Sequence, residues 1–272
     1  MRNFLALLMT AVAAGIANAA DQIEIEAGDF PLKATLYRPA GDGPHPAVVA
    51  MHGCGGLLDR AGRHRPEYAD WAERLVAAGF AVLFPDSYTS RGLGPQCTVQ
   101  RRGIRPDRER LGDAYAARHW LQSQSWVQAD RVSLLGWSQG AVAALWTVRP
   151  RAAPKDDKPD FRAAVAFYPG CRRLNDTAWS ARIPTLILLG ASDDWARARD
   201  CEQMVAQARG RSAHATIVKY RGAYHYFDRA NLPFQERTGQ AFTPDGSGRV
   251  HVGSNADARA DVLRRVPEWL RR

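Results

Sequence analysis

The chain carries six short runs of apolar residues, each bounded by glycine, proline or aspartate. These runs are residues 47–51, 81–84, 132–135, 163–167, 185–189 and 216–220. A strand that is apolar at successive positions is buried on both faces, as in a parallel sheet covered by helices. The pattern therefore predicts an α/β fold in which a mostly parallel sheet lies between two layers of helices.

Helix-length segments separate these runs and favour the same fold. Apolar residues recur at helical spacing over residues 68–78, 108–122 and 257–270. Residues 23–26 and 33–37 alternate between apolar and polar side chains, which is typical of a hairpin. No repeat or break in composition interrupts residues 20–272, so we interpret them as a single domain.

Three connections, residues 86–106, 150–160 and 231–255, are longer than is usual in such folds. The first and the last follow the carboxyl ends of predicted strands. Because open α/β sheets bind their ligands at this edge, we expect these two connections to form the walls of a pocket.

The first 19 residues have the features of a secretory signal peptide. Arg2 provides a positive start, residues 4–16 are almost entirely apolar, and Ala17-Asn18-Ala19 has the small-residue pattern of a cleavage site. The apolar run is shorter than the ~20 residues that a membrane-spanning helix needs. We therefore predict cleavage after Ala19 and a mature protein, free of the membrane, in a bacterial periplasm or outside the cell.

Export affects the interpretation of the cysteines. Four cysteines in an oxidising compartment predict two disulfides, and three pairings are open to Cys54, Cys97, Cys171 and Cys201. Their spacing from the histidines does not fit a zinc site, so we expect no metal. The net charge of +9 is spread along the chain rather than gathered with aromatic residues, which argues against a nucleic-acid partner. The oligomeric state is left open.

The strongest functional signal is the sequence Gly136-Trp137-Ser138-Gln139-Gly140. It follows the apolar run 132–135 and precedes a helical pattern over residues 141–148. A serine in such a strand–turn–helix setting is exposed at a sharp turn, close to the first N–H groups of the helix. Because a serine hydroxyl is a weak nucleophile at neutral pH, it also needs a base. We therefore predict that Ser138 is the nucleophile of a hydrolase.

The acid and the base are expected after the next strands. Asp193 and Asp194 follow the run 185–189, and we place Asp193 on the catalytic histidine and Asp194 at the start of the next helix. His225 follows the run 216–220, which gives the order serine, aspartate, histidine expected for this architecture. His251, further along the last long connection, is the alternative base.

Acyl transfer also needs two N–H donors for the oxyanion. One is the backbone N–H of Gln139, directly after the nucleophile. The other is expected from the glycine-rich sequence HGCGG at residues 52–56, with Cys54 as the first choice and Gly53 as the alternative. The His52 side chain is interpreted as a hydrogen-bonded anchor of this loop.

Residues 30–271 resemble the α/β-hydrolase superfamily and, within it, the dienelactone hydrolase family. The resemblance is carried by residues 52–56 (HGCGG), 136–140 (GWSQG), 190–193 (GASD) and 224–228 (YHYFD). It implies an eight-stranded, mostly parallel sheet flanked by helices and an activity that needs no cofactor. The cysteine, acid and histidine of the family correspond to Ser138, Asp193 and His225. Similar exported members with a serine nucleophile imply the disulfides Cys54–Cys97 and Cys171–Cys201.

The sequence therefore predicts a serine hydrolase of small-molecule carboxylic esters or lactones. Its acyl-enzyme would form on Ser138, with His225 as the base and Asp193 as the orienting acid. An acyltransferase would use the same residues, and a binding module could occupy the same scaffold without catalysis. Aromatic and charged residues on the same loops are candidates for the substrate pocket: Tyr88, Arg91, Trp137, Trp195 and Tyr224.

Overall fold

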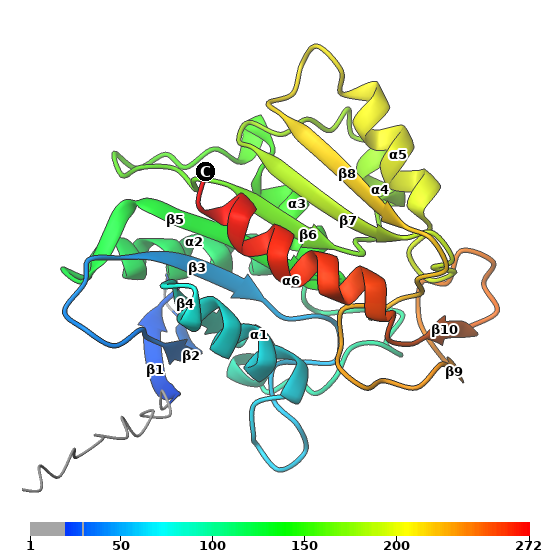
Figure 1. Ribbon diagram of the computed structural model, residues 1–272, viewed down its shortest axis with the longest axis horizontal. Helices are drawn as coiled ribbons and strands as arrows, with labels where there is room; N and C mark the ends of the chain where they lie inside the picture. Colours follow the sequence, from blue (N-terminus) through cyan, green and yellow to red (C-terminus); the bar gives the residue numbers. More distant parts are fainter. Residues whose placement is uncertain (1–19, 29) are drawn as a thin grey trace, which may run out of the picture.

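The apolar runs of the sequence form one twisted sheet in the structure. The computed structural model describes residues 20–28 and 30–272, so the predicted signal peptide lies outside the described residues. Within these residues, eight strands pair in the order β1-β2-β4-β3-β5-β6-β7-β8 (Figure 1). Strand β2 is antiparallel to both of its neighbours, and the remaining strands are parallel. The predicted mostly parallel sheet is confirmed.

The strands of this sheet are β1 (Asp21–Glu26), β2 (Pro31–Tyr37), β3 (His45–Met51), β4 (Ala81–Pro85), β5 (Val127–Trp137), β6 (Ala164–Phe167), β7 (Thr185–Gly190) and β8 (Ala215–Tyr220). Every residue of β4, β6 and β7 is buried, because these strands are covered on both faces. The edge strands β1 and β8 are more exposed, in keeping with their polar positions.

Helices cover both faces of the sheet. They are α1 (Pro66–Ala77), α2 (Glu109–Gln122), α3 (Gln139–Thr147), α4 (Arg172–Asn175), α5 (Ala198–Gln207) and α6 (Ala256–Leu270). Buried residues of α1 and α6 pack against one face, and those of α2, α3 and α5 pack against the other (Figure 1). Among residues 20–28 and 30–272, no helix has the length and apolar character that a membrane crossing requires.

The last long connection is more ordered than the sequence indicated. Within residues 231–255, β9 (Gln235–Arg237) and β10 (Val250–Val252) form a two-stranded antiparallel sheet. A further bridge joins Val252 to His225. Strands of three residues are too short to produce a recognisable alternation, so the sequence offered no signal for them.

A half-buried histidine near the start of α1 should make the stability of the fold depend on pH. The Tyr37 hydroxyl contacts His64 Nδ1 at 3.0 Å, and burial lowers the pKa of His64 to about 4. Between about pH 6.5 and 4 the unfolded chain therefore binds a proton at His64 that the folded chain does not. We expect the free energy of unfolding to fall on acidification by at most about 1.2 kcal/mol per pH unit near the middle of this range, and by about half of that at its ends, because of His64 alone.

The matching measurement is urea unfolding of the wild type and His64→Gln between pH 7 and 4.5. The variant should lose this part of the pH dependence, while the contributions of the carboxylates remain common to both proteins. Parallel stability curves for the two proteins would contradict the prediction.

Candidate active site

Ser138 lies at a sharp turn between strand β5 and helix α3. Its backbone has φ 53° and ψ −115°, a conformation that non-glycine residues rarely adopt. Two glycines allow the turn to close. A Cβ at Gly136 would lie 2.4 Å from the Gly140 carbonyl oxygen, and a Cβ at Gly140 would lie 1.9 Å from the Met51 carbonyl oxygen. The spacing of the GWSQG motif is thus dictated by backbone contact.

Ser138, His225 and Asp193 form one chain of hydrogen bonds. His225 Nε2 lies 3.0 Å from Ser138 Oγ, and His225 Nδ1 lies 2.7 Å from Asp193 Oδ2. The three residues follow β5, β8 and β7 at the carboxyl edge of the sheet, and His225 is only 1% exposed. A carboxylate that accepts from Nδ1 leaves Nε2 free to accept the serine proton. The arrangement can therefore activate the serine hydroxyl.

Asp193 is fixed by its own loop. Its second carboxylate oxygen, Oδ1, accepts hydrogen bonds from the backbone N–H groups of Trp195 and Ala196 at 2.9 and 2.8 Å. One carboxylate therefore orients the histidine and also satisfies the backbone that leads into α5.

The assignment of Asp194 to the start of a helix is wrong. Asp194 instead binds His251, accepting from its backbone N–H at 2.9 Å and contacting Nδ1 at 2.7 Å. Helix α5 begins at Ala198 without a side-chain cap. His251 is thus held on β10 by Asp194, whereas His225 and not the alternative His251 contacts Ser138.

The glycine-rich HGCGG loop, residues 52–56 after β3, lies beside Ser138. A Cβ at Gly53 would come within 3.5 Å of Ser138 Cβ. The Gly53 N–H donates to the Tyr68 hydroxyl at 2.8 Å and is therefore occupied. Within the described chain no hydrogen bond occupies the Cys54 N–H, and the Gln139 N–H is the first of helix α3. Of the donors considered, Cys54 and Gln139 are thus the two available to an oxyanion.

Two disulfides, Cys54–Cys97 and Cys171–Cys201, are present, in the pairing that the resemblance implied. The first joins the HGCGG loop to the long connection after β4. Cys97 in turn accepts from the Ala241 N–H at 2.8 Å, and Trp195 Nε1 donates to the Ala241 carbonyl at 3.0 Å. The HGCGG loop is therefore linked to both long connections.

A cavity of about 680 Å³ opens over Ser138 and His225. Its walls include residues 100–102, 104–106 and 241–244, so the prediction that the first and last long connections line the pocket is confirmed. Other lining residues come from the loop after β6 with α4, and from the segment between β7 and α5. The residues that line the whole cavity include six arginines and two aspartates: Arg101, Arg102, Arg105, Arg172, Arg173, Arg197, Asp176 and Asp200.

Of the five residues predicted to line the pocket, only Trp195 does so. Tyr88 is fully buried beside the HGCGG loop, with its ring centroid 4.6 Å from that of His52. Arg91 does not line the cavity and instead pairs with Asp113 at 2.7 Å.

Trp137 and Tyr224 are also directed elsewhere. Trp137 belongs to the core and donates from Nε1 to the buried Asp228 at 3.0 Å. Tyr224 does not line the cavity and packs on Phe234, with their ring centroids 4.9 Å apart. Both predictions placed a residue by its loop, whereas the direction of the side chain is set by its packing partners.

Asp228 is a buried carboxylate close to His225 that the sequence analysis missed. Its carboxylate accepts from Tyr168 Oη at 2.7 Å, Trp71 Nε1 at 2.8 Å and Trp137 Nε1. The Tyr168 ring lies against His225, with centroids 4.4 Å apart. Burial raises the pKa of Asp228, and the three donors oppose this effect. The one sequence feature that pointed to Asp228 was its position three residues after His225 in YHYFD.

In residues 20–28 and 30–272, no three His, Cys, Asp or Glu side chains gather in a way that could hold a metal ion. The described site consists of side chains and backbone donors of the chain itself.

The comparisons with known proteins agree with this geometry. The family model described as the dienelactone hydrolase family matches residues 32–272. The chain belongs to the dienelactone hydrolase family. It is therefore a hydrolase of the carboxylic-ester or lactone type. In this member of the dienelactone hydrolase family the residue at the sharp turn is a serine, Ser138.

Relatives and solved structures give the same fold. A protein of Bradyrhizobium sp, named a probable 2-oxo-3-(5-oxofuran-2-ylidene)propanoate lactonase, is 26% identical over 223 residues, which are 77% of this chain and 84% of that protein. The crystal structure of a dienelactone hydrolase-like promiscuous phosphotriesterase from metagenomic libraries superimposes with a TM-score of 0.68 at 20% identity, covering 93% of this chain and 97% of that one. The dienelactone hydrolase of Anabaena variabilis ATCC 29413 gives a TM-score of 0.64 at 20% identity, with 93% and 97% covered. At these identities the structures establish the shared fold.

Proposed function

We propose that the chain is a serine hydrolase that cleaves carboxylic esters or lactones through an acyl-enzyme on Ser138. The observation that carries the proposal is the pair of contacts of His225, at 3.0 Å to Ser138 Oγ and 2.7 Å to Asp193 Oδ2, at the floor of the cavity. Only a base in this position can take the serine proton as the new bond to the substrate forms.

The reaction follows from these positions. His225 Nε2 accepts the proton of Ser138 as Oγ attacks the substrate carbonyl, and the resulting oxyanion accepts from the Cys54 and Gln139 N–H groups. His225 then protonates the leaving alcohol. Water attacks the acyl-enzyme with the same histidine as base, which releases the acid and restores the serine.

The adduct itself tests this mechanism. A p-nitrophenyl phosphonate should inactivate the protein with stoichiometric release of p-nitrophenol, and mass spectrometry should locate the phosphonyl group on the peptide that contains Ser138. An adduct on another residue, or no adduct beside measurable ester turnover, would refute Ser138 as the nucleophile. Product analysis in the presence of an added alcohol separates hydrolysis from acyl transfer.

The charge of the cavity supports a preference for substrates with an anionic group. Arg102 is partly buried, donates from Nε to the Gln96 carbonyl at 2.9 Å and lies over the Phe242 ring. No salt-bridge partner for Arg102 is present among the described residues, and burial lowers its pKa. The Bradyrhizobium relative is named for a propanoate. A desolvated arginine without a carboxylate is well placed to bind one.

Arg102→Gln should therefore discriminate between charged and neutral esters. For p-nitrophenyl hydrogen adipate, which ends in a carboxylate, we expect kcat/KM to fall about tenfold, because a charge-assisted hydrogen bond is lost. For p-nitrophenyl hexanoate, kcat/KM should change less than about twofold. Arg108→Gln, an exposed arginine outside the cavity, is the matched control. Equal losses on both esters would contradict an anion-binding role.

We also propose that the protein acts in the periplasm or outside the cell, as predicted from residues 1–19. The two disulfides support this location, because such bonds form and persist in oxidising compartments.

A further inference from the structure

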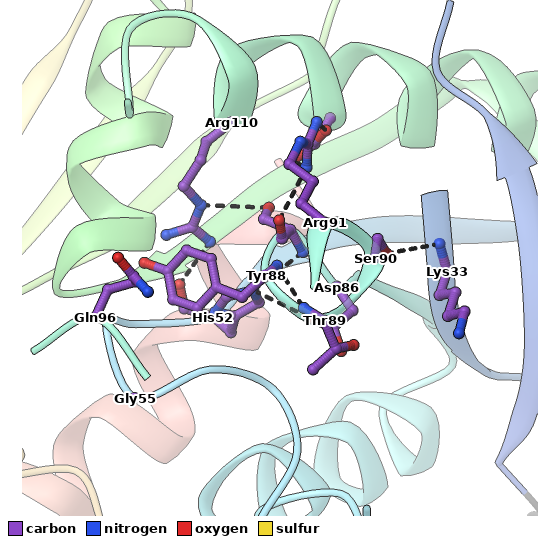
Figure 2. A network of polar contacts seen from close by, with 12 residues as sticks. Lys33, His52, Gly55, Asp86, Tyr88, Thr89, Ser90, Arg91, Gln96 and Arg110 are labelled. Atoms are coloured by element: carbon purple, nitrogen blue, oxygen red, sulfur yellow. Dashed lines mark hydrogen bonds and ion pairs between the residues drawn. The ribbon is translucent and has the colours of Figure 1, made fainter. Parts of the chain in front are cut away.

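Arg110, at the start of α2, is a buried arginine that forms no salt bridge within the described residues. The residue is 0% exposed, donates from Nη2 to the His52 carbonyl at 2.7 Å and contacts Ser87 Oγ from Nε at 3.3 Å (Figure 2). Asp113, one turn along the helix, is occupied by both terminal nitrogens of Arg91. Within the described residues Nη1 of Arg110 has no hydrogen-bond partner. Burying a charge in this way costs several kcal/mol, so the contact with His52 calls for an explanation.

The His52 ring is held in one tautomer. Its Nε2 lies 3.2 Å from the Ser87 backbone N, and its Nδ1 lies 2.8 Å from the Gly53 carbonyl oxygen. A backbone N–H can only donate, so Nε2 accepts and Nδ1 carries the hydrogen that is donated to Gly53. A proton on Nε2 would face the Ser87 N–H and break this arrangement.

The hydrogen bond from His52 to the Gly53 carbonyl fixes the direction of the Cys54 N–H, a proposed oxyanion donor. The Gly53 C=O and the Cys54 N–H belong to one planar trans peptide and point in opposite directions. His52 Nδ1 and the Gly56 N–H, at 2.8 and 3.2 Å, hold the carbonyl on one side. The Cys54 N–H therefore points to the other side, and Cys54 lines the cavity that holds Ser138.

The hydrogen bond from Arg110 to the His52 carbonyl lies where the two segments of the proposed oxyanion hole meet. The His52 carbonyl that Arg110 holds lies against the start of α3, since a Cβ at Gly140 would come within 2.6 Å of its oxygen. Gln139, the second proposed donor, is the residue before Gly140. Arg110 thus binds the backbone at the junction of the two donor segments.

The charges around His52 favour the neutral ring. Burial lowers the pKa of His52 well below its usual range, and the Arg110 charge lowers it further. The hydrogen bond to the Gly53 carbonyl raises this pKa but is outweighed. Other groups face the ring from the neighbouring elements: Asp86 at 3.9 Å, Tyr88, His64 and Arg65. Asp86 opposes Arg110, but its carboxylate already accepts from the Tyr88 and Thr89 N–H groups.

We propose that Arg110 is a positioning residue of the oxyanion hole, which holds the His52 carbonyl and keeps the His52 ring on the Gly53 carbonyl, so that the Cys54 N–H is directed at the substrate. The inference rests on the proposed function, because it assigns Arg110 a task in that reaction. Arg110 does not touch the reacting atoms. It acts through His52 and the peptide between Gly53 and Cys54.

The test compares Arg110→Met and Arg110→Lys with Arg118→Met. Arg118 is on the same helix, and its buried side chain pairs with Asp156 away from the cavity. Each variant is measured for thermal unfolding, for kcat and KM on a p-nitrophenyl ester, and for inhibition by phenylboronic acid, which forms a tetrahedral anion on the serine. We expect Arg110→Met to lower kcat by 10- to 100-fold, expressed as about 1.4 to 2.8 kcal/mol of transition-state stabilisation, with KM changed less than about twofold.

The boronic acid should bind Arg110→Met more weakly by about the same factor as the loss of kcat/KM. Arg110→Lys should recover part of the loss, and Arg118→Met should lose stability but keep its kcat. Equal kcat values for Arg110→Met and Arg118→Met, below the unfolding temperature of both, would overturn the inference. If Arg110→Met does not fold, Arg110→Lys carries the same comparison.

A second measurement does not depend on turnover. By nitrogen NMR, His52 of the wild type should remain neutral with its hydrogen on Nδ1 from pH 8 to 5. In the Arg110 variants it should take up a proton at higher pH, and kcat should decline at the same pH. If the tautomer and the titration of His52 are the same in the Arg110 variants as in the wild type, the role of Arg110 is refuted and the proposed function still stands. A wild type that turns over no ester would refute the proposed function and, with it, the task of Arg110.

Discussion

Ser138→Ala should lose ester hydrolysis by about five orders of magnitude in kcat, because no other group can form the acyl-enzyme. The remaining rate would come from the oxyanion donors and from substrate binding alone. The measurement is the hydrolysis of a short-to-long series of p-nitrophenyl esters by the purified mature protein and by the variant. The chain-length profile of the wild type would also begin to define the acyl pocket.

Ser133 offers a matched control on the same strand, β5. It is buried, and its hydroxyl has no hydrogen-bond partner within the described residues. Ser133→Ala removes the same atom a few residues away and should leave the rate within about twofold, since Ser133 does not reach the cavity. Should Ser138→Ala retain more than a hundredth of the wild-type rate, the acyl-enzyme mechanism would lose its nucleophile.

Gly140→Ala should prevent stable folding. The added Cβ would lie 1.9 Å from the Met51 carbonyl oxygen and 2.6 Å from that of His52, and both obstacles are backbone atoms of the central strand β3 and its loop. Relief requires helix α3 to move away from the sheet, which would open the core. We expect a loss of more than about 4 kcal/mol in the free energy of unfolding, measured by urea unfolding, or no recovery of folded protein.

Gly112→Ala is the opposite case and serves as the control. Gly112 lies within helix α2, and a Cβ there would meet no atom within 4 Å. Alanine in a helix is favoured over glycine, so this variant should gain about 0.5 to 1 kcal/mol. A loss below 1 kcal/mol for Gly140→Ala would show that the turn around Ser138 is more adaptable than its geometry implies.

The fold could be predicted because one pattern was repeated. Strands β3, β4 and β7 are buried on both faces, and their apolar residues are therefore continuous in the sequence. Helices α1 and α6 had clear spacing because one side of each faces the sheet. The pair β9 and β10 had no such pattern, since three residues cannot show a period.

The candidate site was predictable to the extent that the backbone determines it. Ser138, Asp193 and His225 occupy the ends of three parallel strands, and their order in the chain is a consequence of topology. Residues whose role depends on where a long side chain points were not predictable. Tyr88 and Arg91 lie on the expected connection but turn toward His52 and Asp113.

The sequence did not single out Arg102 and Arg110 as functional residues. Arginine is abundant throughout the chain, so neither Arg102 nor Arg110 stood out in the sequence. Their roles depend on burial and on the absence of a paired carboxylate within the described residues, which are properties of the folded chain. Only the tertiary structure separates them from surface arginines such as Arg108.

The cavity walls at residues 100–106 and 241–244 lie outside the strands and helices, and they are anchored through Cys97 and Ala241. The two segments that shape the pocket are therefore largely distinct from the strands and helices that form the core. Exposed residues of these walls, such as Arg101 and Arg105, can change without disturbing the core, whereas Ile104 and Ala241 are buried. A randomised set confined to these two segments, with both anchors kept, should yield mostly folded proteins of diverse preference.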